Sequence, residues 1–152
     1  MLTEEEKSEI LREIEHYPRR QAAGVAALRI VQKHRGWVPE VGEIAGLLGM
    51  TPAELEGVAT FYNSIFLKPL GRHVIFICDS ISCWISGYDL LRAHLQDRLG
   101  IKPGETSPDG RFTLLAISCL GICHEAPAMM IDEKLYTKLD KEKIDALLEQ
   151  YG

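Results

Sequence analysis

The cysteines are the residues whose types and spacing point most directly to chemistry. Four are present: Cys78 and Cys83 in CDSISC, then Cys119 and Cys123 in CLGIC, with 35 residues between the two pairs. A [2Fe-2S] cluster is held by four thiolates, two for each iron. Two loops that each supply a close pair of cysteines therefore fit an iron-sulfur ligand set.

Other uses of these cysteines are open at this point. Structural zinc also takes four thiolates, and cysteines also serve as small buried apolar residues. Thioredoxin-type dithiol exchange needs C-x-x-C, which neither pair has. We expect His124, beside Cys123, to be a loop residue and His73 to be structural, because histidine-ligated clusters use two histidines in place of two cysteines.

Composition agrees with a reduced metal site. The chain has 152 residues, of which 46% are hydrophobic, so it can bury a core without disulfides. It starts with the charged stretch MLTEEEKSEI and has no apolar run long enough to cross a bilayer, which predicts a cytoplasmic protein without membrane insertion. Cytoplasmic cysteines stay as thiols. The net charge of −5 does not favour nucleic-acid binding.

Residues 1–70 are expected to form a small helical bundle. Thr3 and Glu6 make a capping box that begins a helix burying Ile10, Leu11 and Ile14. A second helix is expected over 20–34 with Gly36 at its C-terminal cap, and a third over 41–48 that ends at Gly49. Thr51 and Glu54 form another capping box, which begins a fourth helix reaching residue 60. Residues 66–71 read as a linker.

Residues 71–152 show strand patterns that deliver the cysteines. A strand over 73–77 runs into Cys78, and a strand over 112–117 leads to Cys119. A helix over 86–99 with Ser86 as N-cap connects them, which implies parallel pairing. Parallel strands end at the same sheet edge, so the two cysteine loops are expected to meet there.

The chain is expected to close with a hairpin and a helix. Residues 128–131 and 134–137 flank a turn, and Asp140 caps a last helix that reaches residue 149. The resulting order, βαββα, is a thioredoxin-like arrangement.

Motifs for substrate chemistry are missing from the sequence. There is no G-x-G-x-x-G, P-loop, H-E-x-x-H or G-x-S-x-G. A cluster moves single electrons and does no substrate chemistry by itself, so we expect the chain to work between partners and to lack a substrate site.

Several longer segments extend the cysteine pattern. They are HRGWVP at 34–39, EGVATFY at 56–62, GRHVIFICDS at 71–80, IKPGETSPDGRFTLL at 101–115 and APAMMIDE at 126–133. Together with the cysteine spacing, they resemble the 24-kilodalton (E) subunit family of respiratory complex I, NADH:quinone oxidoreductase. The resemblance implies a helical bundle followed by a thioredoxin-like [2Fe-2S] ferredoxin domain, with all four cysteines as ligands.

The same resemblance implies an assembly at the cytoplasmic face of the inner membrane. Its other members would be an F-type subunit that binds FMN and NADH, on which this chain docks, and a large G-type iron-sulfur subunit. Equivalent diaphorase subunits of NAD-linked hydrogenases and formate dehydrogenases are the alternative, as is a scaffold stapled by zinc. For the N-terminal aromatics, we expect Trp37 at an interface and Phe61 in the core.

Overall fold

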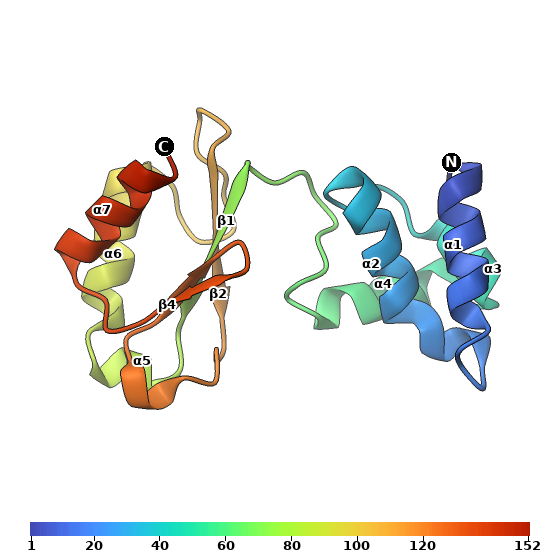
Figure 1. Cartoon of the computed structure of the whole chain (residues 1–152), viewed down its shortest axis with the longest axis horizontal. Helices are drawn as coiled ribbons and strands as arrows, with labels where there is room; N and C mark the ends of the chain where they lie inside the picture. Colours follow the sequence, from blue (N-terminus) through green and yellow to red (C-terminus); the bar gives the residue numbers. More distant parts are fainter. The chain divides into compact units, whose positions relative to one another are not determined.

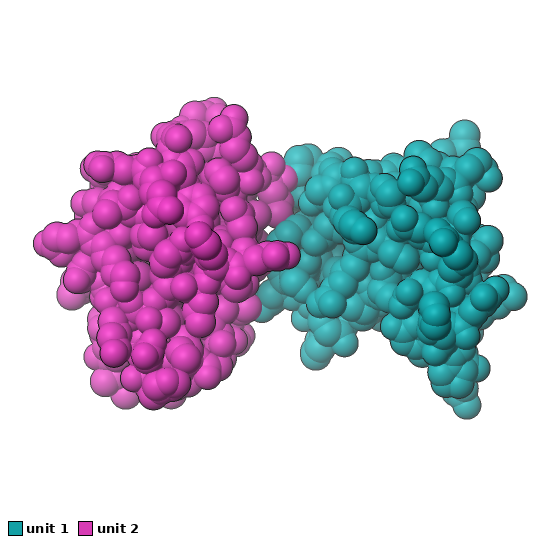
Figure 2. Space-filling view, in the orientation of Figure 1, with its two compact units in different colours: residues 1–69 teal, residues 70–152 magenta.

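The chain forms two compact units in a computed structural model that describes all of residues 1–152. The first unit runs from Met1 to Pro69 and the second from Leu70 to Gly152. Figure 1 traces the chain through both, and Figure 2 colours them separately. None of the helices has both the length and the apolar character needed to cross a membrane.

The first unit is entirely helical. Its elements are α1 (Glu4–Ile14), a 3₁₀ turn η1 (Arg20–Ala23), α2 (Gly24–Arg35), α3 (Gly42–Leu48) and α4 (Pro52–Phe61). Both predicted capping boxes are confirmed: Thr3 exchanges hydrogen bonds with Glu6 before α1, and Thr51 does so with Glu54 before α4. The left-handed Gly36 and Gly49 end α2 and α3, as the sequence predicts.

Two burial predictions for this unit are wrong. Leu11 is 47% exposed, because the buried stripe of α1 follows Glu6, Ile10 and Ile14, and residue 11 lies about 100° around the helix from residue 10. Phe61 is 79% exposed at the last position of α4. Two steps of about 100° from the buried Ala59 turn Phe61 away from the core.

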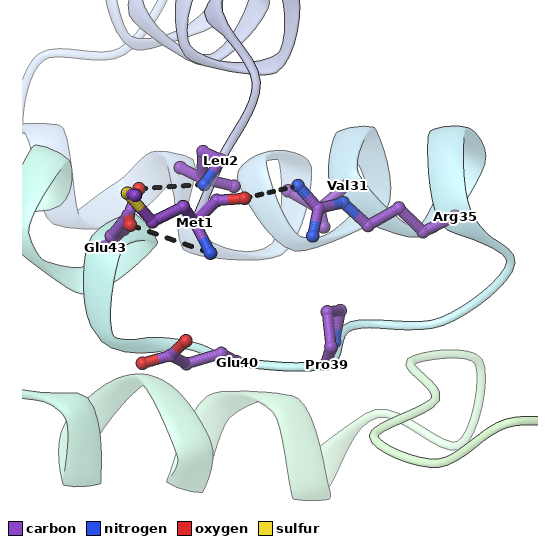
Figure 3. A pocket seen from close by; sticks show the side chains of 7 residues that line it. All are labelled: Met1, Leu2, Val31, Arg35, Pro39, Glu40 and Glu43. Atoms are coloured by element: carbon purple, nitrogen blue, oxygen red, sulfur yellow. Dashed lines mark hydrogen bonds and ion pairs between the residues drawn. The ribbon is translucent and has the colours of Figure 1, made fainter.

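A buried carboxylate connects α1 to α2. The Glu6 side chain is 1% exposed and accepts from Nε and Nη2 of Arg35, each at 2.5 Å. Arg35 Nη2 also donates to the Met1 carbonyl at 2.9 Å, and the Leu2 N–H donates to Glu43 at 2.8 Å. Figure 3 shows Met1, Leu2, Arg35 and Glu43 among the residues that line a small hollow of about 10 Å³. The pair and its neighbours therefore attach the start of the chain to α2 and α3.

The second unit is a four-stranded sheet with helices. Its elements are β1 (His73–Cys78), α5 (Ile81–Ile85), α6 (Tyr88–Leu99), β2 (Phe112–Ile117), a 3₁₀ turn η2 (Cys123–Glu125), β3 (Met129–Ile131), β4 (Lys134–Tyr136) and α7 (Lys141–Gln150). The strand order is β2-β1-β3-β4. The predicted parallel pairing of β1 with β2 and the predicted hairpin of β3 with β4 are both confirmed.

The segment after β1 differs from the sequence prediction. Residues 81–85 form the extra helix α5, and Ser86 is the cap at its C-terminal end, not the N-cap of the next helix. Gly87, with φ of +105°, turns the chain into α6. Leu90 is 68% exposed, because α6 buries Tyr88, Leu91 and Leu95, which follow helical spacing without it. The end of α6 at Gly100 is as predicted.

The core of the second unit lies between the sheet and its helices. Figure 1 shows α6 and α7 side by side along one face of the sheet, and the two helices are in contact. Fully buried side chains come from β1, β2 and β3 and from both helices, including Ile75, Leu95, Leu114, Met129, Ile131 and Ile144. Asp140 begins α7 by accepting the N–H of Lys143 at 2.7 Å, as predicted. This core fixes the strand ends that carry the cysteines.

Candidate metal centre

The first cysteine pair lies where β1 ends and α5 begins. Cys78 is the last residue of β1, and Cys83 is in α5, with Ser80 at the N-cap between them. Both cysteines are only 2% exposed. The short helix turns the chain back after the strand, so two cysteines five positions apart share one buried corner of the unit.

The second pair follows β2 at the same edge of the sheet. Cys78 is paired in register with Ile117, and the N–H of Asp79 donates to the Ile117 carbonyl at 2.9 Å. The chain continues from there to Cys119 and to Cys123 at the start of η2. These two cysteines are exposed, and their Sγ atoms are 3.8 Å apart. The parallel register therefore brings both predicted loops to one edge.

Backbone contacts join the two loops. The Leu120 N–H hydrogen-bonds to the sulfur of Cys78, and the Ala128 N–H to the sulfur of Cys83. The Cys78 N–H donates to the Ala128 carbonyl at 3.1 Å, and α5 contacts η2. The cysteines meet as two pairs: no three histidine, cysteine or acidic side chains are grouped as ligands of a single metal ion.

The two buried thiols differ in acidity. Burial acts to raise the pKa of Cys78, but hydrogen bonds from the Ser80 hydroxyl and from the N–H groups of Ser80 and Leu120 outweigh burial, and the pKa is lowered. Burial raises the pKa of Cys83, and the neighbouring Cys78 adds to that increase. Cys78 therefore becomes a thiolate at lower pH than Cys83. The sequence does not disclose these donors, because they depend on how the loops cross.

Gly121 shapes the exposed loop. Its φ is +79°, in the left-handed region that favours glycine, and its N–H donates to Cys119 Sγ at 3.2 Å. A side chain at this position would strain the turn that directs the N–H at the sulfur.

Other candidate residues near the cysteines have separate contacts. His73 Nδ1 lies 2.8 Å from an Asp132 carboxylate oxygen at the far end of β1, which supports its predicted structural role. His124 is exposed in η2. Trp84 is 56% exposed on α5, and its Nε1 donates to Asp89 at 3.0 Å. Its aromatic face therefore belongs to the surface beside Cys83.

The donor set fits a [2Fe-2S] cluster. Such a cluster needs four thiolates, two for each iron, and the structure presents two pairs at one edge. Backbone N–H groups of Leu120, Gly121 and Ala128 point at three of the sulfurs, where they offset the negative charge of the thiolates.

Comparison with known proteins assigns the chain to a family. The family model described as thioredoxin-like [2Fe-2S] ferredoxin matches residues 10–152. The chain belongs to this family. Membership confirms the thioredoxin-like fold and the [2Fe-2S] cofactor that the sequence predicts.

Two curated relatives of this thioredoxin-like ferredoxin carry the same name. The E subunit of NADH-quinone oxidoreductase from Escherichia coli (strain K12) is 51% identical over 152 residues, covering 99% of this chain and 92% of the relative. The protein of the same name from Pseudomonas aeruginosa is 46% identical, with the same coverage of both chains. The resemblance noted in the sequence is confirmed.

A solved structure extends the likeness to a second kind of enzyme. A chain of an NAD⁺-reducing [NiFe]-hydrogenase in the air-oxidized state matches with a TM-score of 0.70 and 27% identity. The match covers 85% of this ferredoxin and 22% of the hydrogenase chain, so the ferredoxin spans about a fifth of that longer chain.

Proposed function

We propose that this chain is the electron-carrying E subunit of the NADH-oxidising arm of NADH:quinone oxidoreductase. The observation that carries the proposal is that two cysteine pairs lie at one edge of the sheet. The chain is also 51% identical to a subunit of that name. The assembly would lie at the cytoplasmic face of the inner membrane.

Cys78, Cys83, Cys119 and Cys123 would hold the cluster. The buried pair suits one iron and the exposed pair the other, because the Sγ atoms of Cys119 and Cys123 are already 3.8 Å apart. When bound, a [2Fe-2S] cluster supplies one-electron transfer. The chain's residues screen Cys78 and Cys83 from water and direct N–H groups at the sulfurs.

The substrate and flavin belong to other subunits in this proposal. FMN and NADH would bind to the F-type subunit, and the large G-type iron-sulfur subunit would complete the arm. The exposed pair lies on the surface of the second unit, and Trp84 is exposed on α5, the helix that contacts η2. That placement suits exchange of electrons with a carrier held by a neighbouring protein.

The first unit is proposed to take part in docking on the F-type subunit. Phe61 is 79% and Tyr62 41% exposed, and their rings meet edge to face with centroids 5.2 Å apart. Exposed aromatic side chains are common anchors of protein interfaces. The half-buried Trp37 is a further candidate for the same role.

The hydrogenase likeness favours a second candidate function. The chain would then be the equivalent diaphorase subunit of an NAD-linked hydrogenase or formate dehydrogenase. The higher identity to the NADH-quinone oxidoreductase subunits, 51% against 27%, supports the first assignment. Identification of the subunits that co-purify with the tagged chain from its own cell distinguishes the two.

Anaerobic purification of the chain tests its chemistry. We expect about two irons and two acid-labile sulfides per chain, and an electron paramagnetic resonance signal of spin one half after reduction by dithionite. Zinc without sulfide, in protein made with ample iron, would instead support the zinc-stapled scaffold. Zinc is colourless, so the visible spectrum gives an early answer.

Gly121→Ala is expected to weaken retention of the cluster. An alanine with φ near +79° costs about 1 kcal/mol and turns the Gly121 N–H away from Cys119. Iron transfer to a chelator should be several-fold faster than in the unchanged chain. Gly100→Ala is the matched control, because Gly100 has a φ of +68° at the end of α6. Equal rates of iron loss in both variants would contradict the role of Gly121.

Phe61→Ala is expected to weaken binding to the F-type subunit about tenfold, the loss typical of an interface anchor. Leu11→Ala is the control, because Leu11 is also an exposed large apolar residue of the first unit, at 47%. Binding of the loaded chain to the immobilised F-type subunit gives both affinities. Unchanged affinity for Phe61→Ala would remove Phe61 from the docking surface.

A further inference from the structure

Ser80 places a hydroxyl between the two buried sulfurs. The Cys78 thiol donates to the Ser80 Oγ at 3.3 Å, and the same hydroxyl hydrogen-bonds to Cys83. A serine hydroxyl has one proton to donate and rotates to suit its partner. A thiolate can only accept, so once the cysteines are thiolates the Ser80 hydroxyl becomes the donor in this contact.

The hydroxyl is free for this contact because it does not cap the helix. Ser80 is the N-cap of α5, a position where serine normally accepts a backbone N–H, yet its side chain makes no such bond. Its carbonyl accepts the Trp84 N–H at 2.8 Å, which fixes the main chain at the start of α5. The helix therefore fixes the main chain of Ser80, and the side chain remains available to hydrogen-bond with the two cysteines.

A donor at this position favours the reduced cluster. Reduction adds one electron, and so one negative charge, to the cluster and its thiolates. A hydroxyl that donates to a cluster sulfur is bound more strongly after the charge increases, which raises the reduction potential. The effect is strengthened by burial, since Cys78 and Cys83 are only 2% exposed and the surroundings screen charge poorly.

We propose that the Ser80 hydroxyl is a positioning group that raises the reduction potential of the cluster through the Cys78–Cys83 side. The proposal rests on the assignment of these cysteines as ligands. It adds a side chain to the backbone N–H groups that already face the sulfurs.

The test is a redox titration of the intact, anaerobically purified chain, followed by electron paramagnetic resonance. Ser80→Ala should shift the one-electron equilibrium about tenfold toward the oxidised state, which lowers the midpoint potential by about 59 mV. Ser80→Thr keeps a hydroxyl and should retain most of the native potential. Ser118→Ala makes the same chemical change in the other cysteine loop, where Ser118 is exposed, and should leave the potential unchanged.

Each other outcome has a defined meaning. A Ser80→Ala potential equal to that of Ser118→Ala overturns the proposal. Loss of the cluster from Ser80→Ala while Ser80→Thr and Ser118→Ala retain it also overturns the proposal, because Ser80 would then act in retention. Absence of any iron-sulfur signal from the unchanged chain would instead refute the proposed function, which separates the two failures.

Discussion

Replacing Cys83 with serine is expected to lower the iron and sulfide content of the purified chain by more than about tenfold. Loss of residues that only support metal ligands already costs about 10- to 100-fold in affinity, and a ligand matters more. Serine has nearly the shape of cysteine but lacks the soft thiolate that iron-sulfur clusters use. Iron and sulfide assays, with the visible spectrum, measure the effect.

The fold should survive this substitution, because Cys83 contributes a small side chain to a core built mainly from the sheet and α6 and α7. Circular dichroism of the anaerobically purified variant checks that point. Ser118→Ala is the control for a substitution beside a ligand that does not remove one. Native iron and sulfide in Cys83→Ser would show that the fourth ligand lies elsewhere and would refute the proposed set.

Glu6→Gln is expected to destabilise the first unit by about 2 kcal/mol near neutral pH. Hydrogen bonds from Arg35 lower the pKa of Glu6 from 4.5 to about 2, against the opposing effect of burial. A shift of that size corresponds to a few kcal/mol, reduced here because the Arg35 side chain is 26% exposed and partly screened. Glutamine keeps the shape of the side chain but loses the charge that Arg35 binds.

The same ion pair gives the first unit a defined acid sensitivity. The folded pKa of Glu6 lies below its unfolded value, so its contribution is complete above about pH 4.5 and is lost as the pH falls toward 2. The stability difference between the unchanged chain and Glu6→Gln should therefore shrink over this range. Acidification that left the difference constant would contradict the ion-pair account.

Tryptophan fluorescence reports on the first unit separately. Trp37 belongs to the first unit and Trp84 to the second, so a Trp84→Phe background leaves Trp37 as the one tryptophan. Urea unfolding of the intact chain, followed through Trp37 at several pH values, measures the effect of Glu6→Gln. Glu4→Gln is the control, since the Glu4 side chain is 92% exposed, and should leave the midpoint nearly unchanged.

Much of the secondary structure can be predicted from local chemistry. The capping boxes at Thr3 and Thr51 and the end of α6 at Gly100 follow from hydrogen bonds that neighbouring residues make with one another. The parallel pairing of β1 with β2 follows from the strand-helix-strand order, and it brings both cysteine loops to one edge. The sequence alone therefore predicts that the two cysteine pairs lie at the same edge of the sheet.

The wrong predictions concern features of the structure that depend on tertiary contacts. The helix α5 has too few residues to show a period, and it is stabilised by its place between β1 and α6, so Ser86 looked like an N-cap. Leu11 is apolar and next to a buried position, but it lies just outside the narrow buried stripe of α1. The hydrogen bond from Leu120 to the Cys78 sulfur depends on how the loops cross, which no local pattern encodes.

The hydrogen bond from the Cys78 N–H to the Ala128 carbonyl sets an order of events during synthesis. The first unit contains its own apolar core and ends at Pro69, so its contacts are available before the first cysteine leaves the ribosome. The Cys78 N–H has no access to this acceptor until 50 further residues have been synthesised, because the acceptor is the carbonyl of Ala128. A nascent chain that ends after Cys123 but before Ala128 therefore has all four thiols but lacks the hydrogen-bond acceptor that holds the end of β1.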